Sequence, residues 1–146
     1  MLEKTFFMIK PDGVARGLEN EVFSRVEKAE LKILLKRLIF LTEELAKALY
    51  LPHFGKPFYA GLIKFITSGP VIVSLLEGED AINKVRLLMG ATDPRSAGKG
   101  TIRGDLKEEN ILSPEGIMKN IVHGSDGAES ARRELAIFFK EKWNEN

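Results

Sequence analysis

The chain has 146 residues, with 22 Lys and Arg against 21 Asp and Glu, and it contains no cysteine. This length is typical of one domain that can bury a hydrophobic core without disulfides. The absence of cysteine excludes a disulfide scaffold, a thiolate metal site and a cysteine nucleophile. The net charge of +1 argues against a nucleic-acid or membrane binder. With no signal peptide pattern and no apolar run near the roughly 20 residues of a membrane span, we expect one cytoplasmic domain over residues 1–146.

The first half of the chain alternates predicted strands and helices. Apolar, β-favouring runs indicate the strands, and apolar residues at helical spacing indicate the helices. Turn residues such as Pro11, Pro52 and Gly55 separate these elements. In chain order we expect a strand over 5–9, a helix from Asn20, a strand over 31–41, and helices over 43–50 and 57–67.

The second half continues the same alternation but contains a long irregular segment. We expect a strand over 71–76, a helix over 79–89, a loop from 91 to about 116, a strand over 118–122 and a helix over 128–142. Acidic residues open the helix over 79–89 and Gly90 follows its end, as capping preferences predict. Ser125 and Asp126 are the predicted N-caps of the last helix. A loop of this length in a compact domain is more often functional than not.

This order of elements predicts an α+β fold of the ferredoxin-like, split βαβ type. Its sheet would be four-stranded and antiparallel, covered by helices, with the long loop before the last strand. We find no internal repeat and no linker that would divide the chain.

The long loop carries residue types that bind phosphate but no standard nucleotide motif. A P-loop fails because Asp93 stands where its first glycine belongs and Gly100 replaces its hydroxyl residue. No G-x-G-x-x-G motif is present. Threonine and arginine within residues 92–105 could still hold an anion, and Arg86 on the preceding helix could join them. The alternative is a solvated charged loop.

Only His53 and His123 could supply imidazole chemistry. His123 follows a predicted strand, and a neutral imidazole is a competent nucleophile towards phosphorus as well as a base. The alternative is a structural histidine, which is our interpretation of His53. Lys10 shares the inward face of Phe6 and Met8, so we expect it to need an anionic partner.

Five segments together resemble the nucleoside diphosphate kinase family. They occur in the order of that family, at its spacing as far as Asp105, and they cover nearly the whole chain. The segments are KPDGV at 10–14, KPFY at 56–59, SGPV at 68–71, GTIRGD at 100–105 and NIVHGSD at 120–126.

The resemblance implies ping-pong transfer of the γ-phosphoryl group from a nucleoside triphosphate, typically ATP, to a nucleoside diphosphate. His123 would carry the group as phosphohistidine, and the long loop would bind the nucleotide. Mg²⁺ would be held by the phosphates and water rather than by protein ligands. The resemblance also implies a homo-oligomer, either a hexamer or a tetramer.

The same resemblance assigns roles to individual residues. It places Lys10 and Tyr50 at the transferring phosphoryl group, and it makes Ser125 and Glu134 the pair that orients His123. It implies that Arg86, Thr92 and Arg103 hold the phosphates. It also implies that Phe58 and Leu62 bind the base and that Asn120 contacts the ribose. Because stacking on Phe58 accepts any base, broad base tolerance follows.

Three features depart from the common form of the family. About seven additional residues lie between Asp105 and Asn120, within the segment 106–118. Lys99 replaces a proline, which makes the rim of the loop more basic. Glu30 stands where a glycine usually ends the first helix. A left-handed residue there would cost about 1 kcal/mol, so we expect this helix to end differently. The carboxyl-terminal tail around Trp143 is a place where longer members make subunit contacts.

Two other classes of function remain to be weighed against a kinase. A nucleotide-binding module without turnover would have lost a histidine, lysine or arginine of the site, and none is lost. An RNA-binding ferredoxin-like domain would carry aromatic stacking residues in a K/R-G-F/Y-G/A-F-V pattern, which this sequence lacks.

Overall fold

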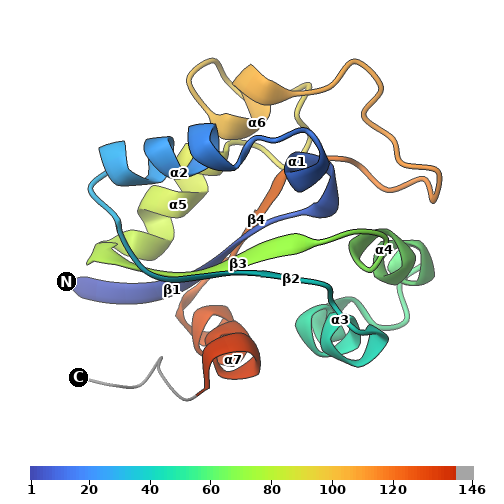
Figure 1. Ribbon diagram of the computed structural model, residues 1–146, viewed down its shortest axis with the longest axis horizontal. Helices are drawn as coiled ribbons and strands as arrows, with labels where there is room; N and C mark the ends of the chain where they lie inside the picture. The colour runs from blue at the N-terminus through green and yellow to red at the C-terminus, as the bar shows by residue number, and fades with distance from the viewer. Residues whose placement is uncertain (141–146) are drawn as a thin grey trace.

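The fold is built on a four-stranded antiparallel sheet in the order β2-β3-β1-β4. The computed structural model describes residues 1–140, and Figure 1 shows how the strands and helices are arranged. The strands are β1 (Leu2–Ile9), β2 (Lys32–Ile39), β3 (Val71–Glu79) and β4 (Val122–Gly124). The central strand β1 pairs with β3 along its length, from Leu2 opposite Glu79 to Ile9 opposite Ile72. The predicted fold class is therefore confirmed.

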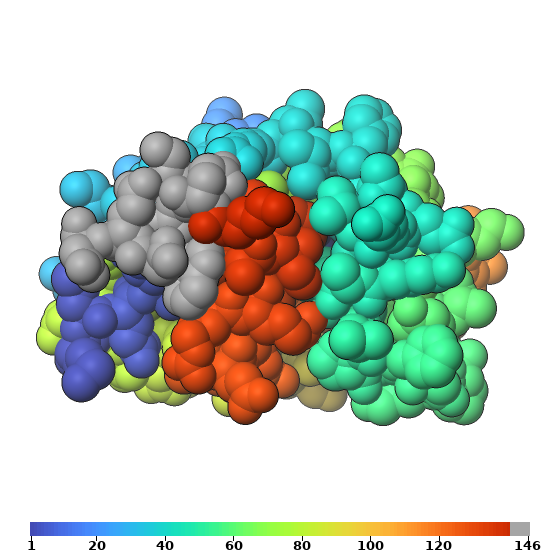
Figure 2. All heavy atoms as spheres, turned by 90° about the horizontal axis from the view of Figure 1, so that it is seen from below, coloured from blue at the N-terminus to red at the C-terminus, as the bar shows by residue number. Residues whose placement is uncertain are grey.

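Helices cover both faces of this sheet. They are α1 (Pro11–Ala15), α2 (Glu19–Lys28), α3 (Glu43–Leu49), the 3₁₀ helix η1 (Leu51–His53), α4 (Tyr59–Ile66), α5 (Ala81–Met89), α6 (Ile102–Leu106) and α7 (Ala128–Phe139). In Figure 1, α2, α5 and α6 lie above the sheet and α3 and α7 below it. Figure 2 looks from below and shows α7, in orange to red, beside the cyan and green α3–α4 region.

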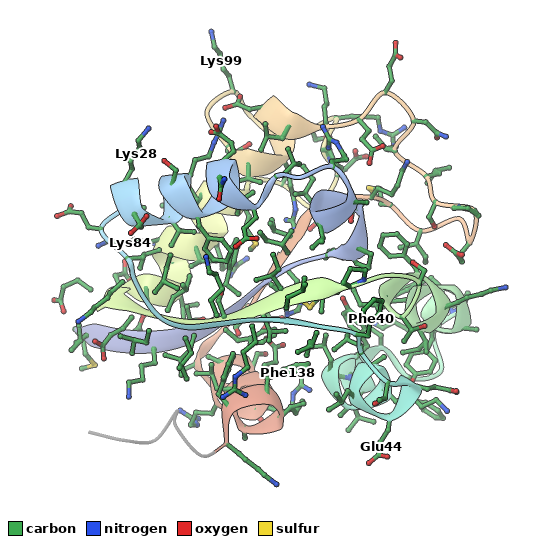
Figure 3. All side chains as sticks on the ribbon, viewed as in Figure 1. Lys28, Phe40, Glu44, Lys84, Lys99 and Phe138 are labelled. Carbon is green, nitrogen blue, oxygen red and sulfur yellow. The ribbon has the colours of Figure 1, made fainter. Side chains whose placement is uncertain are left out.

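The alternation of side chains along β1 produces two hydrophobic cores. Phe6 and Met8 face α3, α4 and α7, whereas Phe7 and Ile9 face α2, α5 and α6. The ring of Phe138 on α7 stacks on Phe6 with centroids 4.9 Å apart, in the space between α7 and the sheet (Figure 3). Both faces of the central strand are therefore buried, which explains its continuous apolar sequence.

Two predicted boundaries around the α5 helix and the long loop are wrong. The strand β3 runs on to Glu79, and Asp80 takes a left-handed φ of 51° before α5 begins at Ala81, so no acidic residue lies in the first turn. The segment 91–116 was predicted to be irregular, but it contains α6. Thr101 begins this helix by accepting a hydrogen bond from Gly104 N–H at its Oγ1 atom.

Two further predictions fail near the last strand. Met118 makes only an isolated bridge to Leu112, and β4 begins at Val122 because Ile121 takes a left-handed φ of 73°. The N-cap of α7 is Gly127 rather than Ser125 or Asp126. Residues 141–142 of the predicted helix, and the tail around Trp143, lie outside the described residues.

Glu30 does adopt the left-handed conformation that a glycine would adopt at the end of α2, with a φ of 64°. Its backbone N–H donates to Glu27 O, and the next N–H, that of Leu31, donates to Val26 O. The helix α2 therefore ends with a left-handed residue, as it would with glycine, although this conformation is unfavourable for glutamate.

The additional residues form a compact hairpin, which we define as residues 111–119. Its ends are joined by a 2.6 Å hydrogen bond from Lys119 N–H to Ile111 O, and Ser113 N–H donates to Ile117 O. The hairpin packs on α4, where a Cβ atom placed on Gly61 would lie 3.0 Å from Glu115 O. Figure 1 shows this segment in orange beside α4. Within the described residues, no helix is long and apolar enough to cross a membrane.

Candidate active site

A cleft of about 570 Å³ opens where β4 meets α5 and the start of the long loop. Its lining includes one histidine, two arginines and one aspartate, together with residues that follow the end of α5. The lining residues are Asn83, Arg86, Leu87, Met89, Gly90, Ala91, Thr92, Arg103, His123, Gly124 and Asp126.

His123 lies on β4 opposite Met8 and is fixed by the buried carboxylate of Glu134. His123 Nε2 lies 3.0 Å from Glu134 Oε1, and Ser125 Oγ donates to the same oxygen at 2.7 Å. A carboxylate only accepts hydrogen bonds, so Nε2 carries the hydrogen and Nδ1 of the neutral ring keeps its lone pair. The structure thus brings together three residues that the sequence analysis grouped.

Tyr50 packs edge-on against the imidazole of His123, with ring centroids 6.0 Å apart. Its buried hydroxyl has no hydrogen-bond partner among the described residues. Burial and the nearby Glu134 and Asp12 raise the pKa of Tyr50, so the hydroxyl keeps its proton. It is an unused donor beside the imidazole.

Lys10 is buried at the end of β1 and donates to Asn120 Oδ1 at 2.9 Å. Asn120 in turn donates from Nδ2 to Thr92 O at 3.0 Å. Burial lowers the pKa of Lys10 to about 8, an effect opposed by the charge of Asp12 and assisted by that of Arg103. A bound phosphate would favour the charged ammonium.

Arg103 extends from α6 to hold the backbone on both sides of the cleft. It donates to Asn120 O at 3.1 Å, to Gly90 O at 3.2 Å and to Val122 O at 2.7 Å. Burial lowers its pKa to about 10, which leaves the guanidinium charged near neutral pH. Arg86 is exposed and points its Nη1 atom towards Asp126 O at 3.4 Å.

Ile121, two residues before His123, is the strained residue of the site. A left-handed φ is a genuine outlier for a β-branched side chain and costs about 1–3 kcal/mol. Two hydrogen bonds hold it: Lys10 N–H donates to Ile121 O at 2.8 Å, and Ile121 N–H donates to Asp12 Oδ2 at 2.9 Å. Sequence analysis missed the role of Asp12, although its place in the Lys-Pro-Asp-Gly turn was the available signal.

Like Lys10, Tyr50 and Asn120, the two residues assigned to the base lie outside the lining of the cleft. Phe58 precedes α4 with 44% of its surface exposed, whereas Leu62 is buried in the core beneath that helix. Phe58 is connected to His123 through neighbouring rings, those of His53 and Tyr50. Within the described residues, no group of three or more His, Asp or Glu side chains could hold a metal ion.

Comparison with known proteins gives one consistent result. The family model described as nucleoside diphosphate kinase matches residues 3–143. The nucleoside diphosphate kinase of Carboxydothermus hydrogenoformans is 48% identical over 141 residues, which cover 97% of this chain and 90% of that protein.

Solved structures agree with this result. The enzyme of Halobacterium salinarum in complex with CDP is 43% identical, with a TM-score of 0.88, and the match covers 98% of this chain and 91% of that one. A second structure is a transition state mimic of the enzyme of Borrelia burgdorferi with bound vanadate and ADP. Its sequence is 38% identical and its TM-score is 0.88, and the match covers 99% of this chain and 91% of that one.

Proposed function

Because this chain belongs to the nucleoside diphosphate kinase family, we propose that it transfers the γ-phosphoryl group of a nucleoside triphosphate to a diphosphate through a phosphohistidine at His123. The observation that supports this most directly is the hydrogen bond from His123 Nε2 to the Glu134 carboxylate at the edge of the cleft. It leaves Nδ1 as the nucleophilic atom.

In the first half reaction, the lone pair of Nδ1 attacks the γ-phosphorus and a nitrogen–phosphorus bond forms. The bond from phosphorus to the bridging oxygen breaks, and the diphosphate leaves with that electron pair. Phosphorylated at Nδ1, the ring carries positive charge, which the Glu134 carboxylate stabilises through Nε2–H. In the second half reaction an oxygen of a different diphosphate attacks the same phosphorus. The nitrogen–phosphorus bond breaks, its electron pair returns to Nδ1, and neutral His123 is regenerated.

Positive groups and hydroxyl donors around the cleft would stabilise the transferring phosphoryl group. We assign Arg86, Thr92 and Arg103 to the phosphate oxygens, and Lys10 and Tyr50 to the group in transfer. Such groups contribute most where charge spreads over the equatorial oxygens. The free Tyr50 hydroxyl and the buried Lys10 ammonium are donors that an incoming phosphate could use.

The nucleoside would extend from this clamp towards α4. We propose that the base stacks on Phe58 with Leu62 beside it, and that Asn120 contacts the ribose hydroxyls. Stacking explains how one site could accept several bases, and the related enzymes described above contain CDP in one structure and ADP in the other.

Mg²⁺ would enter this site on the phosphates of the nucleotide. The donor set fits this arrangement, because the described lining offers two guanidinium groups and one carboxylate, that of Asp126. When bound, the ion would neutralise charge on the phosphates. We further propose that the single domain works in the cytoplasm and assembles as a hexamer or tetramer.

Intact mass measurement tests the mechanism. After exposure to ATP and Mg²⁺, the protein should gain one phosphoryl group, and addition of GDP should remove it and produce GTP. His123→Ala should bind nucleotide but gain no mass and show no turnover. Turnover in that variant, or a wild-type protein that binds ATP without gaining mass, would contradict the proposal.

Base tolerance has its own test. Phe58→Ala should weaken the binding of every nucleotide by a similar factor, about tenfold or more. A loss confined to purines or to pyrimidines would show that the site recognises base edges instead.

A further inference from the structure

His53, interpreted from the sequence as a structural residue, lies at the centre of a polar and aromatic cluster. It is the last residue of η1, and its Nδ1 atom lies 3.2 Å from Lys56 Nζ. The same ammonium lies over the ring of Phe58, 5.8 Å from its centroid. The imidazole itself is 5.4 Å from the Phe58 ring. His53, Lys56 and Phe58 therefore contact one another in pairs.

The contact with Lys56 defines the protonation state of His53. An ammonium group can only donate, so Nδ1 must present its lone pair and the ring hydrogen must be on Nε2. A charged imidazole would place two cations at hydrogen-bond distance. Burial, Lys56 and His123 lower the pKa of His53, and Asp126 opposes this shift while Arg133 assists it. The neutral ring is thus the form that the surrounding groups favour.

The position of His53 joins the base site to the nucleophile. Its ring lies 6.0 Å from that of Tyr50, which in turn contacts His123. Phe58 has two such neighbours: the half-buried imidazole of His53 lies beside its ring, and the ammonium of Lys56 lies over it. These contacts leave 44% of its surface exposed, so a base can still reach the ring.

We propose that neutral His53 is a positioning residue for the nucleobase: by accepting a hydrogen bond from Lys56, it holds the ammonium and the Phe58 ring in the arrangement that a base stacks upon. This inference rests on the proposed function, since it requires Phe58 to be the stacking surface. It adds two residues, His53 and Lys56, to the base site.

Protonation of His53 should disrupt this arrangement. The Nδ1 acceptor is lost and the new charge repels Lys56, so one of the two groups must leave the Phe58 ring. Stacking would then require a more mobile ring to be ordered, which costs conformational entropy. Base affinity should therefore fall as the pH drops through the titration of His53.

Adenosine is the probe that isolates this effect, because it has no phosphate to titrate or to respond to added positive charge. Its dissociation constant would be measured by calorimetry with the full chain at about pH 7.5 and about pH 5. The lower pH lies well below a typical histidine titration because the pKa of His53 is lowered. For the wild type we expect adenosine binding to weaken about three- to fivefold at the lower pH, as for loss of one exposed polar pair.

Two substitutions of His53 and one of Lys56 complete the test. His53→Asn keeps an acceptor near the Nδ1 position without a titrating ring, so its affinity should be independent of pH. His53→Leu and Lys56→Met should bind adenosine about three- to fivefold more weakly at both pH values. With ATP at about pH 7.5, both should raise KM and leave kcat unaltered. Lys64→Met, at an exposed lysine of α4, is the matched control.

Two results would overturn the inference. One is a His53→Asn protein whose adenosine affinity falls with pH as much as that of the wild type. The other is wild-type affinity at about pH 7.5 in both His53→Leu and Lys56→Met. Failure of the proposed function would look different, because the wild-type protein would then gain no phosphoryl group from ATP.

Discussion

Lys10 illustrates at the residue scale how a group with a proposed catalytic role can lower stability. Its ammonium is buried against Asn120, and its pKa is lowered to about 8 from a usual value of 10.5. Between these two pH values the unfolded chain binds more protons than the folded one. The free energy of unfolding contributed by this group therefore rises with pH across that window. Below about pH 8, both states are charged and the folded state bears the full cost of burial.

We therefore expect Lys10→Met to stabilise the protein near pH 7 by on the order of 1–2 kcal/mol while reducing turnover strongly. Urea denaturation of the wild type and the variant at about pH 7 and about pH 10.5 would measure the difference. The gain should shrink at the higher pH, where wild-type Lys10 is neutral. Lys64→Met should show no such change, and an equal gain for Lys10→Met at both pH values would contradict the prediction.

At the scale of an element, the end of α2 carries a local conflict between sequence and conformation. Glu30 holds a φ of 64°, which glycine adopts without cost and glutamate does not. Glu30→Gly should raise the free energy of unfolding by about 1 kcal/mol, despite the greater flexibility of glycine in the unfolded chain. Glu30→Ala, which lacks this freedom, should leave stability nearly unchanged. Equilibrium urea denaturation would measure both, and a destabilised Glu30→Gly protein would refute the argument.

The elements also show which features a sequence can predict. Alternation along β1 correctly placed Phe6 and Met8 on one face of the sheet, because a strand has a fixed period of two. The start of β4 was not predictable in this way. Its position depends on Ile121, whose unusual conformation is maintained by hydrogen bonds from residues more than a hundred positions away. Tertiary contacts of this kind override local preference.

Some features of the candidate site could likewise be predicted from the sequence, and others required the folded structure. His123, Ser125 and Glu134 could be grouped only through the resemblance to the nucleoside diphosphate kinase family. The contact of His53 with Lys56 was not predicted, although Lys56 lies only three residues away and this spacing was a possible signal. The additional hairpin could be located between Asp105 and Asn120, but its packing on Gly61 required the folded structure.

For the whole molecule, the edge of the sheet is the feature most relevant to assembly. β2 is the outer strand, and Leu38 and the neighbouring Phe40 expose 63% and 69% of their surfaces. Figure 3 labels Phe40 where the chain leaves β2. Exposed apolar groups at an open strand edge favour pairing with another chain. This edge supports the proposed homo-oligomer.

Charge at this edge should oppose assembly. Wild-type protein is expected to sediment as a multiple of its 16.3 kDa chain mass, whereas Leu38→Lys should shift towards the monomer and melt at a lower, concentration-dependent temperature. Leu112→Lys, at an exposed leucine of the hairpin, is the control for added charge alone. An unchanged assembly in Leu38→Lys would place the subunit contacts on another surface.

The anchoring of His123 by Glu134 has a stereochemical consequence. With Nε2 held, Nδ1 would attack every nucleotide from one fixed direction under the proposed mechanism. An in-line displacement inverts the configuration at phosphorus. Under the proposed mechanism each phosphoryl group undergoes two such displacements at the same atom, once on arrival and once on departure. A γ-phosphorus made chiral with oxygen isotopes and sulfur would therefore reach the product nucleotide with its original handedness.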